Sequence, residues 1–334
     1  MQNTLSVNHV DLEGSSYIQA MKVFKGKYGG ANATTPHNDI IVFDEAQRAW
    51  DIDRREPSQT EATILLRIGD RIAQEHGKVT ILCLIGDGQA IHIYEETGMT
   101  IWANALAGRG DWNVYVPESY NALFNRAPCC GALPELMLNT SIRNDFIDVS
   151  PWVEAILDLD LDRAKALYQE MLGKGLKCWY FREQGKLAGI VHYVNENYPG
   201  SHTGIVVSSH MRANRGYFGQ QYGGSYVKAE DAYNWYMTEG PQLSRGASEF
   251  LIQGIELEYP IVTFIGDYYI QNGQWVLDPR AQFNSKIYDR NTIIKNVYRV
   301  LLTRSRKGMF LYFPQDHKLD ETFLWFKEML DVDV

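Results

Sequence analysis

The sequence predicts an α/β protein with parallel sheets, and three observations support that prediction. Short continuous apolar runs at residues 40–43 and 79–85 are typical of strands buried on both faces of a parallel sheet. The amphipathic stretch at residues 57–75 lies between them and has the length of a crossover helix. The same alternation of helical and strand-like segments resumes after residue 149. We therefore expect two α/β lobes.

The elements of the first lobe follow in order along the chain. The run IIVF at residues 40–43 follows Pro36 and precedes Asp44, so it reads as a strand with a polar end. In the predicted helix at 57–75, four apolar side chains share one face: Ile64, Leu65, Ile68 and Ile72. The second strand, at 79–85, is closed by Gly86 and Asp87. Strand, helix and strand in this order predict a parallel pair whose ligands lie at the carboxyl ends of the strands.

The second lobe is predicted to start after a region rich in turn formers, residues 98–140, which also holds an apolar element at 133–138. We expect domains at residues 1–138 and 139–334. The predicted elements of the second lobe are a helix at 152–172, strands at 204–207 and 261–265, a helix at 292–302 and a strand at 309–313. The acidic run at 158–165 is expected to open or cap a helix.

Composition limits the classes of protein that remain. A chain of 334 residues, 45% hydrophobic, is long enough for two medium lobes. Its net charge of -9 argues against coating nucleic acid through overall charge and leaves room for a local basic groove. The cysteines and histidines lack the spacing of a zinc site or a disulfide framework, and no apolar run is long enough for a membrane span. We expect a soluble cytoplasmic protein with no membrane partner.

The strongest local signal is IIVFDEAQRAW, in which a strand delivers Asp44 and Glu45 to its exposed end. In ATPases with a phosphate-binding loop, one such acid holds Mg²⁺ and the next orients or deprotonates the attacking water. The alternative is that both acids cap a loop, and the following Ala46 and Gln47 weigh against it. We expect Asp44 to be the metal-binding residue, with ATP and Mg²⁺ as cofactors.

The next strand ends in LIGDGQAIH, which places Asp87 and Gln89 where they would face the same ligand. The amide of a glutamine both donates and accepts hydrogen bonds, so Gln89 can sense a γ-phosphate through the attacking water. A Gly-Asp-Gly sequence by itself is more often a plain turn. The acids upstream favour the functional interpretation.

Two arginines are candidates for stabilising phosphoryl charge, Arg143 in LNTSIRND and Arg304 in VYRVLLTRSRKGMFLYFP. A guanidinium remains charged and binds phosphate oxygens in pairs, which suits a transition state with spreading negative charge. Most arginines are solvated surface residues, so each assignment depends on its surroundings.

Several segments together resemble one family. They are SSYIQAMKVFKGKYGG, IIVFDEAQRAWD, CLIGDGQAIH, LNTSIRND, GIVVSSHMR, ASEFLIQGIELEYPIV, NGQWV and NVYRVLLTRSRKGMFLYFP. Their order is similar to that of the Schlafen group 3-like DNA/RNA helicase domain family, over nearly all of residues 15–314. The resemblance implies a superfamily 1 helicase-like P-loop ATPase with two RecA-like lobes.

The resemblance also implies roles for single residues. Asp44 and Glu45 correspond to the acids of motif II, and Gln89 to the sensor of motif III. Arg143 resembles the arginine of motif IV and Arg304 the arginine finger of motif VI. The residues similar to motif V, or otherwise expected near the nucleotide, are Gln253, Gly254, Glu256, Gln47 and Asp87.

The family pattern opens with a Walker A loop, GxxxxGK followed by Ser or Thr, which no segment of this sequence matches. We therefore expect an incomplete first lobe that exposes apolar surface and a sheet edge, and slow or absent ATP hydrolysis by this chain alone. A separate polypeptide could supply the missing part.

Two functions remain open at this point. The first is nucleic-acid-dependent ATP hydrolysis coupled to the binding or remodelling of DNA or RNA, expected to be single-stranded. The alternative is a catalytically inactive module that binds nucleic acid or protein on a helicase scaffold. Aromatic residues near Arg212 and Arg215 could stack on bases or could simply pack in a core.

Overall fold

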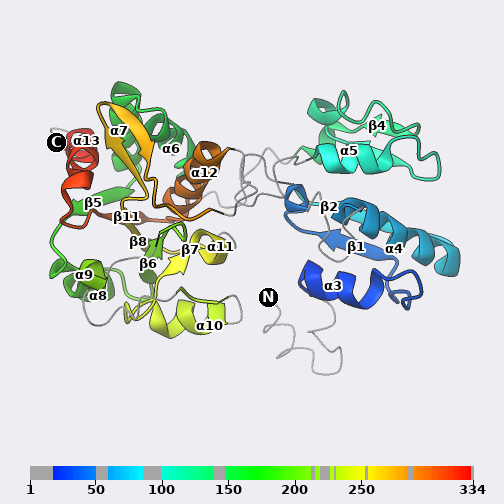
Figure 1. Cartoon of the computed structure of the whole chain (residues 1–334), viewed down its shortest axis with the longest axis horizontal. Helices are drawn as coiled ribbons and strands as arrows, with labels where there is room; N and C mark the ends of the chain where they lie inside the picture. The colour runs from blue at the N-terminus through cyan, green and yellow to red at the C-terminus, as the bar shows by residue number, and fades with distance from the viewer. Residues whose placement is uncertain are drawn as a thin grey trace. The chain divides into compact units, whose positions relative to one another are not determined.

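A computed structural model shows a chain that divides into two compact units, Met1–Asn139 and Thr140–Val334 (Figure 1). Each unit is described by itself. The structure describes residues 18–49, 59–85, 99–137, 147–211, 215–218, 226–228, 231–252, 255–283 and 289–331.

A strand–helix–strand element forms the centre of the first unit. β1 (Ile40–Phe43) and β2 (Thr80–Cys83) pair in parallel, with Phe43 opposite Cys83. The crossover helix α4 (Glu61–His76) is capped by Thr60, whose side chain accepts a hydrogen bond from Thr63 N, and ends at Gly77 in the left-handed conformation. Four side chains of α4 are buried as the sequence predicts: Ile64, Leu65, Ile68 and Ile72.

The prediction that β1 is buried on both faces is wrong. Its side chains alternate, and Ile40 and Val42 are 63% and 57% exposed. On the neighbouring strand, Leu82 and the following Leu84 are also exposed. We call these four side chains the open face, and they lie on the side of the sheet opposite α4. Ile41 and Phe43, in contrast, pack in the apolar clusters beneath α4.

The rest of the first unit packs around this element. α3 (Met21–Tyr28) contacts α4, and the side chains of α5 (Thr100–Leu106) join the same apolar cluster. A second parallel pair consists of β3 (Val114–Val116) and β4 (Cys130–Ala132). Short 3-10 helices lie at Ala46–Arg48, Glu118–Tyr120 and Pro134–Leu136. The last of these occupies the apolar element predicted at 133–138.

A five-stranded parallel sheet organises the second unit. The spatial order is β5-β11-β8-β6-β7 (Figure 1). The strands are β5 (Lys177–Phe181), β6 (Thr203–Val207), β7 (Ala247–Ser248), β8 (Tyr259–Thr263) and β11 (Gly308–Tyr312). Every residue of β6, β8 and β11 is buried. The strands predicted at 204–207 and 309–313 are confirmed within one residue, and that at 261–265 begins and ends two residues earlier.

Helices cover the two faces of this sheet. α8 (Lys186–Asn197) packs through Leu187, Ile190 and Val194 on one face. On the other face, Phe264 stacks on Tyr298 of α12 (Arg290–Leu302) and contacts Phe326 of α13 (Asp320–Leu330). Alternate residues of the central strands therefore reach opposite helical layers, as a parallel sheet requires.

The single helix predicted at 152–172 is two helices, α6 (Ser150–Leu157) and α7 (Leu161–Gly173). Leu159 takes the left-handed conformation with φ 58°, which ends α6. Asp160 then caps α7, its carboxylate accepting from Arg163 N at 3.1 Å. The acidic run therefore opens a helix, as predicted.

Several elements lie in segments for which the sequence predicted no structure, including β5, α8, α13 and the hairpin of β9 (Tyr268–Gln271) and β10 (Gln274–Leu277). Short helical pieces are α9 (Arg215–Phe218), α10 (Ala232–Asn234), a π-helical turn (Trp235–Glu239), α11 (Glu249–Ile252) and a 3-10 helix (His317–Leu319).

Candidate functional site

The carboxyl end of β1 carries the acidic pair predicted from the sequence. Asp44 Oδ1 accepts from Glu45 N at 3.0 Å, and Gln47 Nε2 donates to Glu45 Oε2 at 2.8 Å. Glu45 is held in the left-handed region at φ 56°, which is strained for a side chain other than glycine. Asp44 and Glu45 are thus fixed by a tight turn directly after the strand.

This turn is anchored to the neighbouring strand and to α5. Ala46 N donates to Leu84 O at 2.8 Å, and Trp102 Nε1 donates to Ala46 O at 2.8 Å. Ala46 is fully buried. Because β1 and β2 are parallel and in register, their carboxyl ends meet at one edge of the sheet. Asp87 and Gln89, predicted to act at this edge, lie outside the described residues.

In the second unit, the structure brings Glu256 and Arg304 to the amino edge of the sheet. Leu257 N donates to Arg304 O at 3.1 Å, and Arg306 N donates to Leu257 O at 2.9 Å. Arg306 Nε also donates to Glu256 Oε2 at 2.8 Å. The segments that carry Glu256 and Arg304 are therefore joined side by side, although they are about fifty residues apart in the sequence.

Arg304 is largely buried, at 9% exposure, and its Nε donates to Val300 O at 3.3 Å at the end of α12. The last turn of α12 therefore holds this guanidinium. Arg143, Gln253 and Gly254 lie outside the described residues.

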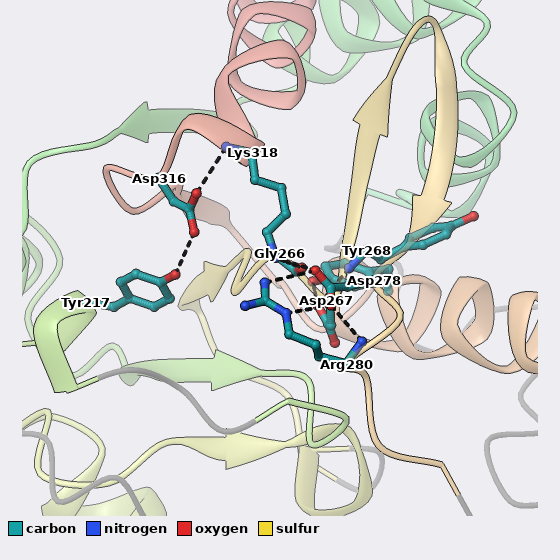
Figure 2. A network of polar contacts seen from close by, with 9 residues as sticks. Tyr217, Gly266, Asp267, Tyr268, Asp278, Arg280, Asp316 and Lys318 are labelled. Atoms are coloured by element: carbon teal, nitrogen blue, oxygen red, sulfur yellow. Dashed lines mark hydrogen bonds and ion pairs between the residues drawn. The ribbon is translucent and has the colours of Figure 1, made fainter.

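A polar network that the sequence did not predict lies at the carboxyl edge of the same sheet (Figure 2). Asp278 is its centre and is only 4% exposed. Its Oδ1 accepts from Arg280 N and Nε at 2.8 and 3.0 Å, and its Oδ2 accepts from Arg280 Nη2 and Lys318 Nζ at 3.1 and 2.7 Å. These bonds, from Arg280 first, hold the pKa of Asp278 well below its usual value.

Lys318 lies across the backbone of the β8–β9 loop (Figure 2). Its Nζ donates to Gly266 O at 2.6 Å. Gly266 has φ 75°, and a Cβ there would lie 2.8 Å from Lys318 Cε. Only glycine therefore allows both this backbone conformation and the close approach of Lys318.

The network continues through Asp316 to Tyr217. Asp316 Oδ1 accepts from Lys318 N at 3.0 Å, and its Oδ2 accepts from Tyr217 Oη at 3.0 Å. Burial and this bond raise the pKa of Tyr217 to about 12, so the phenol remains a donor at neutral pH. Tyr217 lines a cavity of about 440 Å³ together with Arg182, Gln184, Tyr312, Pro314 and Gln315.

Two buried carboxyl groups lie deeper in the second unit. Asp267 Oδ1 accepts from Tyr298 Oη at 2.6 Å, and Glu249 Oε1 accepts from Ser209 Oγ at 2.5 Å. Glu249 also lies 3.8 Å from His210 Nε2. Both carboxyls are fully buried, and this burial raises the pKa of each. We assign them to the interior of the fold.

One family of known proteins matches almost the whole chain. The model of the Schlafen group 3, DNA/RNA helicase domain matches residues 3–315. The chain belongs to this family. Schlafen group 3 membership makes it a helicase-like domain and makes DNA or RNA its expected partner. A search of curated proteins gave no match.

Other features of the described residues are consistent with this assignment. All four cysteines are free. Within the described ranges, no helix has both the length and the apolar character needed to cross a membrane. The described acidic, histidine and cysteine side chains also form no group of three or more that could hold a metal ion.

The carboxyl-edge network has little local signature in the sequence. Its members come from α9, the β8–β9 loop, the segment after β10 and the segment after β11, and no local motif links them. The one local signal is the segment NGQWVLDPR, in which Asp278 and Arg280 follow a strand and have a single proline between them.

Proposed function

We propose that this chain is a nucleic-acid-dependent, superfamily 1 helicase-like ATPase of two RecA-like lobes, with its nucleotide at the acidic turn after β1. The observation that carries the proposal is the fixed pair of Asp44 and Glu45 at the carboxyl end of a parallel strand, where α/β sheets bind ligands. Membership in a DNA/RNA helicase domain family supports the coupling to nucleic acid.

The acidic turn suits Mg²⁺ bound with ATP. Carboxylate oxygens are the ligands that Mg²⁺ prefers, and it keeps several waters in such sites. Glu45 N donates to Asp44 Oδ1, and this bond orients the Asp44 carboxylate. The Asp44 side chain stays exposed and can receive a metal or its water. When bound, the ion neutralises phosphate charge.

Glu45 is the group that orients or deprotonates the attacking water. Gln47 fixes one of its carboxylate oxygens, Oε2, through the amide bond of 2.8 Å. The fixed position matters because catalysis of phosphoryl transfer depends mostly on positioning and electrostatics. In this proposal, Asp87 and Gln89 contribute from the end of β2.

The second lobe carries the residues that resemble motifs IV, V and VI. We assign the arginine finger to Arg304 and the motif V contact to Glu256, whose segments are hydrogen-bonded together. The Nε of Arg304 donates to Val300 O, and its two Nη groups are the donors assigned to a phosphate. Arg143, Gln253 and Gly254 complete the set in this proposal.

The proposal requires a phosphate-binding loop from a polypeptide segment outside this sequence. The open face of Ile40, Val42, Leu82 and Leu84 supports this, because parallel sheets are ordinarily covered on both faces. Without that segment we expect the chain to hydrolyse ATP slowly or not at all. We assign single-stranded DNA or RNA as the partner polymer and the cytoplasm as the location, which the four free thiols support.

Binding of a fluorescent ATP analogue with Mg²⁺ tests the proposal. We expect saturable binding by the purified chain in the micromolar range, weakened at least tenfold in Asp44→Ala. The matched control is Asp39→Ala, at the opposite end of β1, where Asp39 faces Lys78 at 3.5 Å. Equal weakening by both substitutions would remove Asp44 from the site.

A catalytically inactive binding module is the second candidate, and the lack of a GxxxxGK sequence in the chain favours it. The same assay separates the two functions. If a folded sample binds a single strand and no nucleotide, the chain is a binding module on a helicase scaffold.

A further inference from the structure

The cavity at the carboxyl ends of β5 and β11 has the size and walls of a site for one nucleotide unit. Its volume is about 440 Å³, within the usual range of small-molecule sites. Tyr217 is half-buried and presents aromatic surface, and Gln184 and Gln315 add amides, whereas Tyr312 and Pro314 lie buried behind the wall. Such walls suit a planar ring with polar edges.

The charged groups around this cavity are already paired. Arg182 bonds Asp320 Oδ1 at 2.6 Å and the carbonyl oxygens of Pro314 and Asp316. Glu183 faces Lys186 Nζ at 3.1 Å. Asp316 accepts from Tyr217 and from Lys318 N. Arg182 and Glu183 are therefore ion-paired, whereas the Asp316 carboxylate is held by two neutral donors and interacts electrostatically with Arg280.

Arg280 is held beside this cavity by a buried carboxylate, and its own side chain is 74% exposed. Asp278 engages Arg280 through Nε and Nη2, and no described residue bonds Nη1. This ion pair orients Arg280, because the buried Asp278 carboxylate bonds one edge of its guanidinium while the arginine side chain stays exposed.

The charges of Arg280 and Lys318 are balanced by two carboxylates. Asp278 bonds both cations, and Asp316 interacts electrostatically with Arg280, so these four groups together carry no net charge. Lys318 is the inner cation, with a side chain 15% exposed, and Arg280 is the outer one. The outer guanidinium is therefore available to an anion.

We infer that this edge binds one nucleotide of a single strand, with its base against Tyr217 in the cavity and its phosphate on Arg280. The Tyr217 hydroxyl is bonded to Asp316, and Arg280 interacts electrostatically with both Tyr217 and Asp316, so the two parts of the site are adjacent. A guanidinium suits phosphate oxygens, and stacking on an aromatic ring tolerates any base. The inference rests on the proposed function, which requires a strand, and it locates one contact of that strand.

Binding of fluorescein-labelled single strands of 20 nucleotides, DNA and RNA in separate arms, tests the inference by fluorescence anisotropy. Arg280→Ala should raise Kd about tenfold. It should also reduce the slope of log Kd against log salt by about 0.7, the loss of one phosphate contact. Lys174→Ala is the control, since Lys174 is an exposed cation of this unit that pairs with Glu170, and it should change neither quantity.

Tyr217 separates stacking from a structural role. Tyr217→Phe keeps the ring and removes the hydroxyl, so binding should stay within about twofold, whereas Tyr217→Ala should weaken it at least about fivefold. Arg280→Ala should keep the melting temperature of the unchanged chain, because Asp278 retains Lys318 when Arg280 is removed. If Tyr217→Ala fails to fold, Arg280→Ala and its salt slope decide the outcome.

Three results would overturn the inference. Equal effects of Arg280→Ala and Lys174→Ala would do so while leaving the proposed function intact. Competition by a free 5′-mononucleotide as strong as that of the strand would assign the site to a free nucleotide instead. No strand binding by the unchanged chain would contradict both, and nucleotide binding by the same sample would show whether the nucleotide half of the proposal survives.

Discussion

The parallel sheets of the two units are built from similar sequence and are buried very differently. β1 reads IIVF and β8 reads YPIVT, and both are short apolar runs. Every side chain of β8 is buried between two helical layers. In β1, alternate side chains stay exposed on the open face. A continuous apolar run therefore identifies a strand, but the neighbours of that strand decide how many of its faces are buried.

The two sheets also differ in how the polar groups at their edges are assembled from the chain. In the first unit, the acidic turn comes from contiguous residues, Asp44 to Gln47, at the end of one strand. In the second unit, the carboxyl-edge network joins four separate segments through a five-stranded sheet. A site made of contiguous residues can be recognised in a sequence, whereas one assembled by topology cannot.

The largest expected effect comes from matched isoleucines in the two sheets. Ile261 is fully buried in β8 and Ile40 is 63% exposed in β1. We expect Ile261→Ala to lower the free energy of unfolding by about 2–5 kcal/mol through the lost burial and the cavity left behind. Ile40→Ala should change it by about 0.5 kcal/mol or less. Urea unfolding followed by circular dichroism measures both.

A large loss of unfolding free energy in Ile40→Ala would contradict the difference in burial between the two sheets. It would mean that the open face is covered in solution, for example by another molecule. Dilution distinguishes the two cases, because a covering partner makes the cost depend on protein concentration.

A smaller effect is expected from the buried carboxyls of the second unit. Burial raises the pKa of Glu249 and of Asp267, so the unfolded chain loses these protons at lower pH than the folded chain does. Their contribution to stability is complete below the unfolded pKa and is lost as pH rises through the folded pKa. Lowering pH from neutral toward 5 should therefore raise the melting temperature of the second unit.

Glu249→Gln should reduce this rise, because the amide does not titrate. Asp278 acts in the opposite direction, since its pKa is lowered by Arg280 and Lys318, and its contribution is lost only as pH falls below the usual aspartate range. A melting temperature that falls steadily from neutral pH to 5 in the unchanged chain would contradict the assignment of the buried carboxyls.

Much of the regular structure was predictable because its signals are local. α4 and α12 show amphipathic periodicity, and β6 and β11 are continuous apolar runs. The hairpin of β9 and β10 also has a local signal, the Asn-Gly pair at its turn. Asn272 and Gly273 both adopt positive φ, 53° and 71°, as an Asn-Gly hairpin turn requires.

Other features depended on information that no short segment contains. The break between α6 and α7 occurs at Leu159, a residue type that rarely adopts positive φ, so the apolar periodicity predicted one long helix. Lys318 and Asp278 are forty residues apart and meet only because β8 and β11 are neighbours. The turn at Asp44 was predicted because its strand, its acids and its glutamine are contiguous.

The central claim, that this chain couples a nucleotide to a strand of nucleic acid, is tested most directly by measuring one ligand in the presence of the other. The measurement is the Kd of the labelled single strand with and without saturating Mg²⁺ and a non-hydrolysable ATP analogue. We expect the nucleotide to change this Kd by about fivefold or more in the unaltered chain and to leave it unchanged in Asp44→Ala. An unchanged Kd in the unaltered chain, with nucleotide bound, would contradict it.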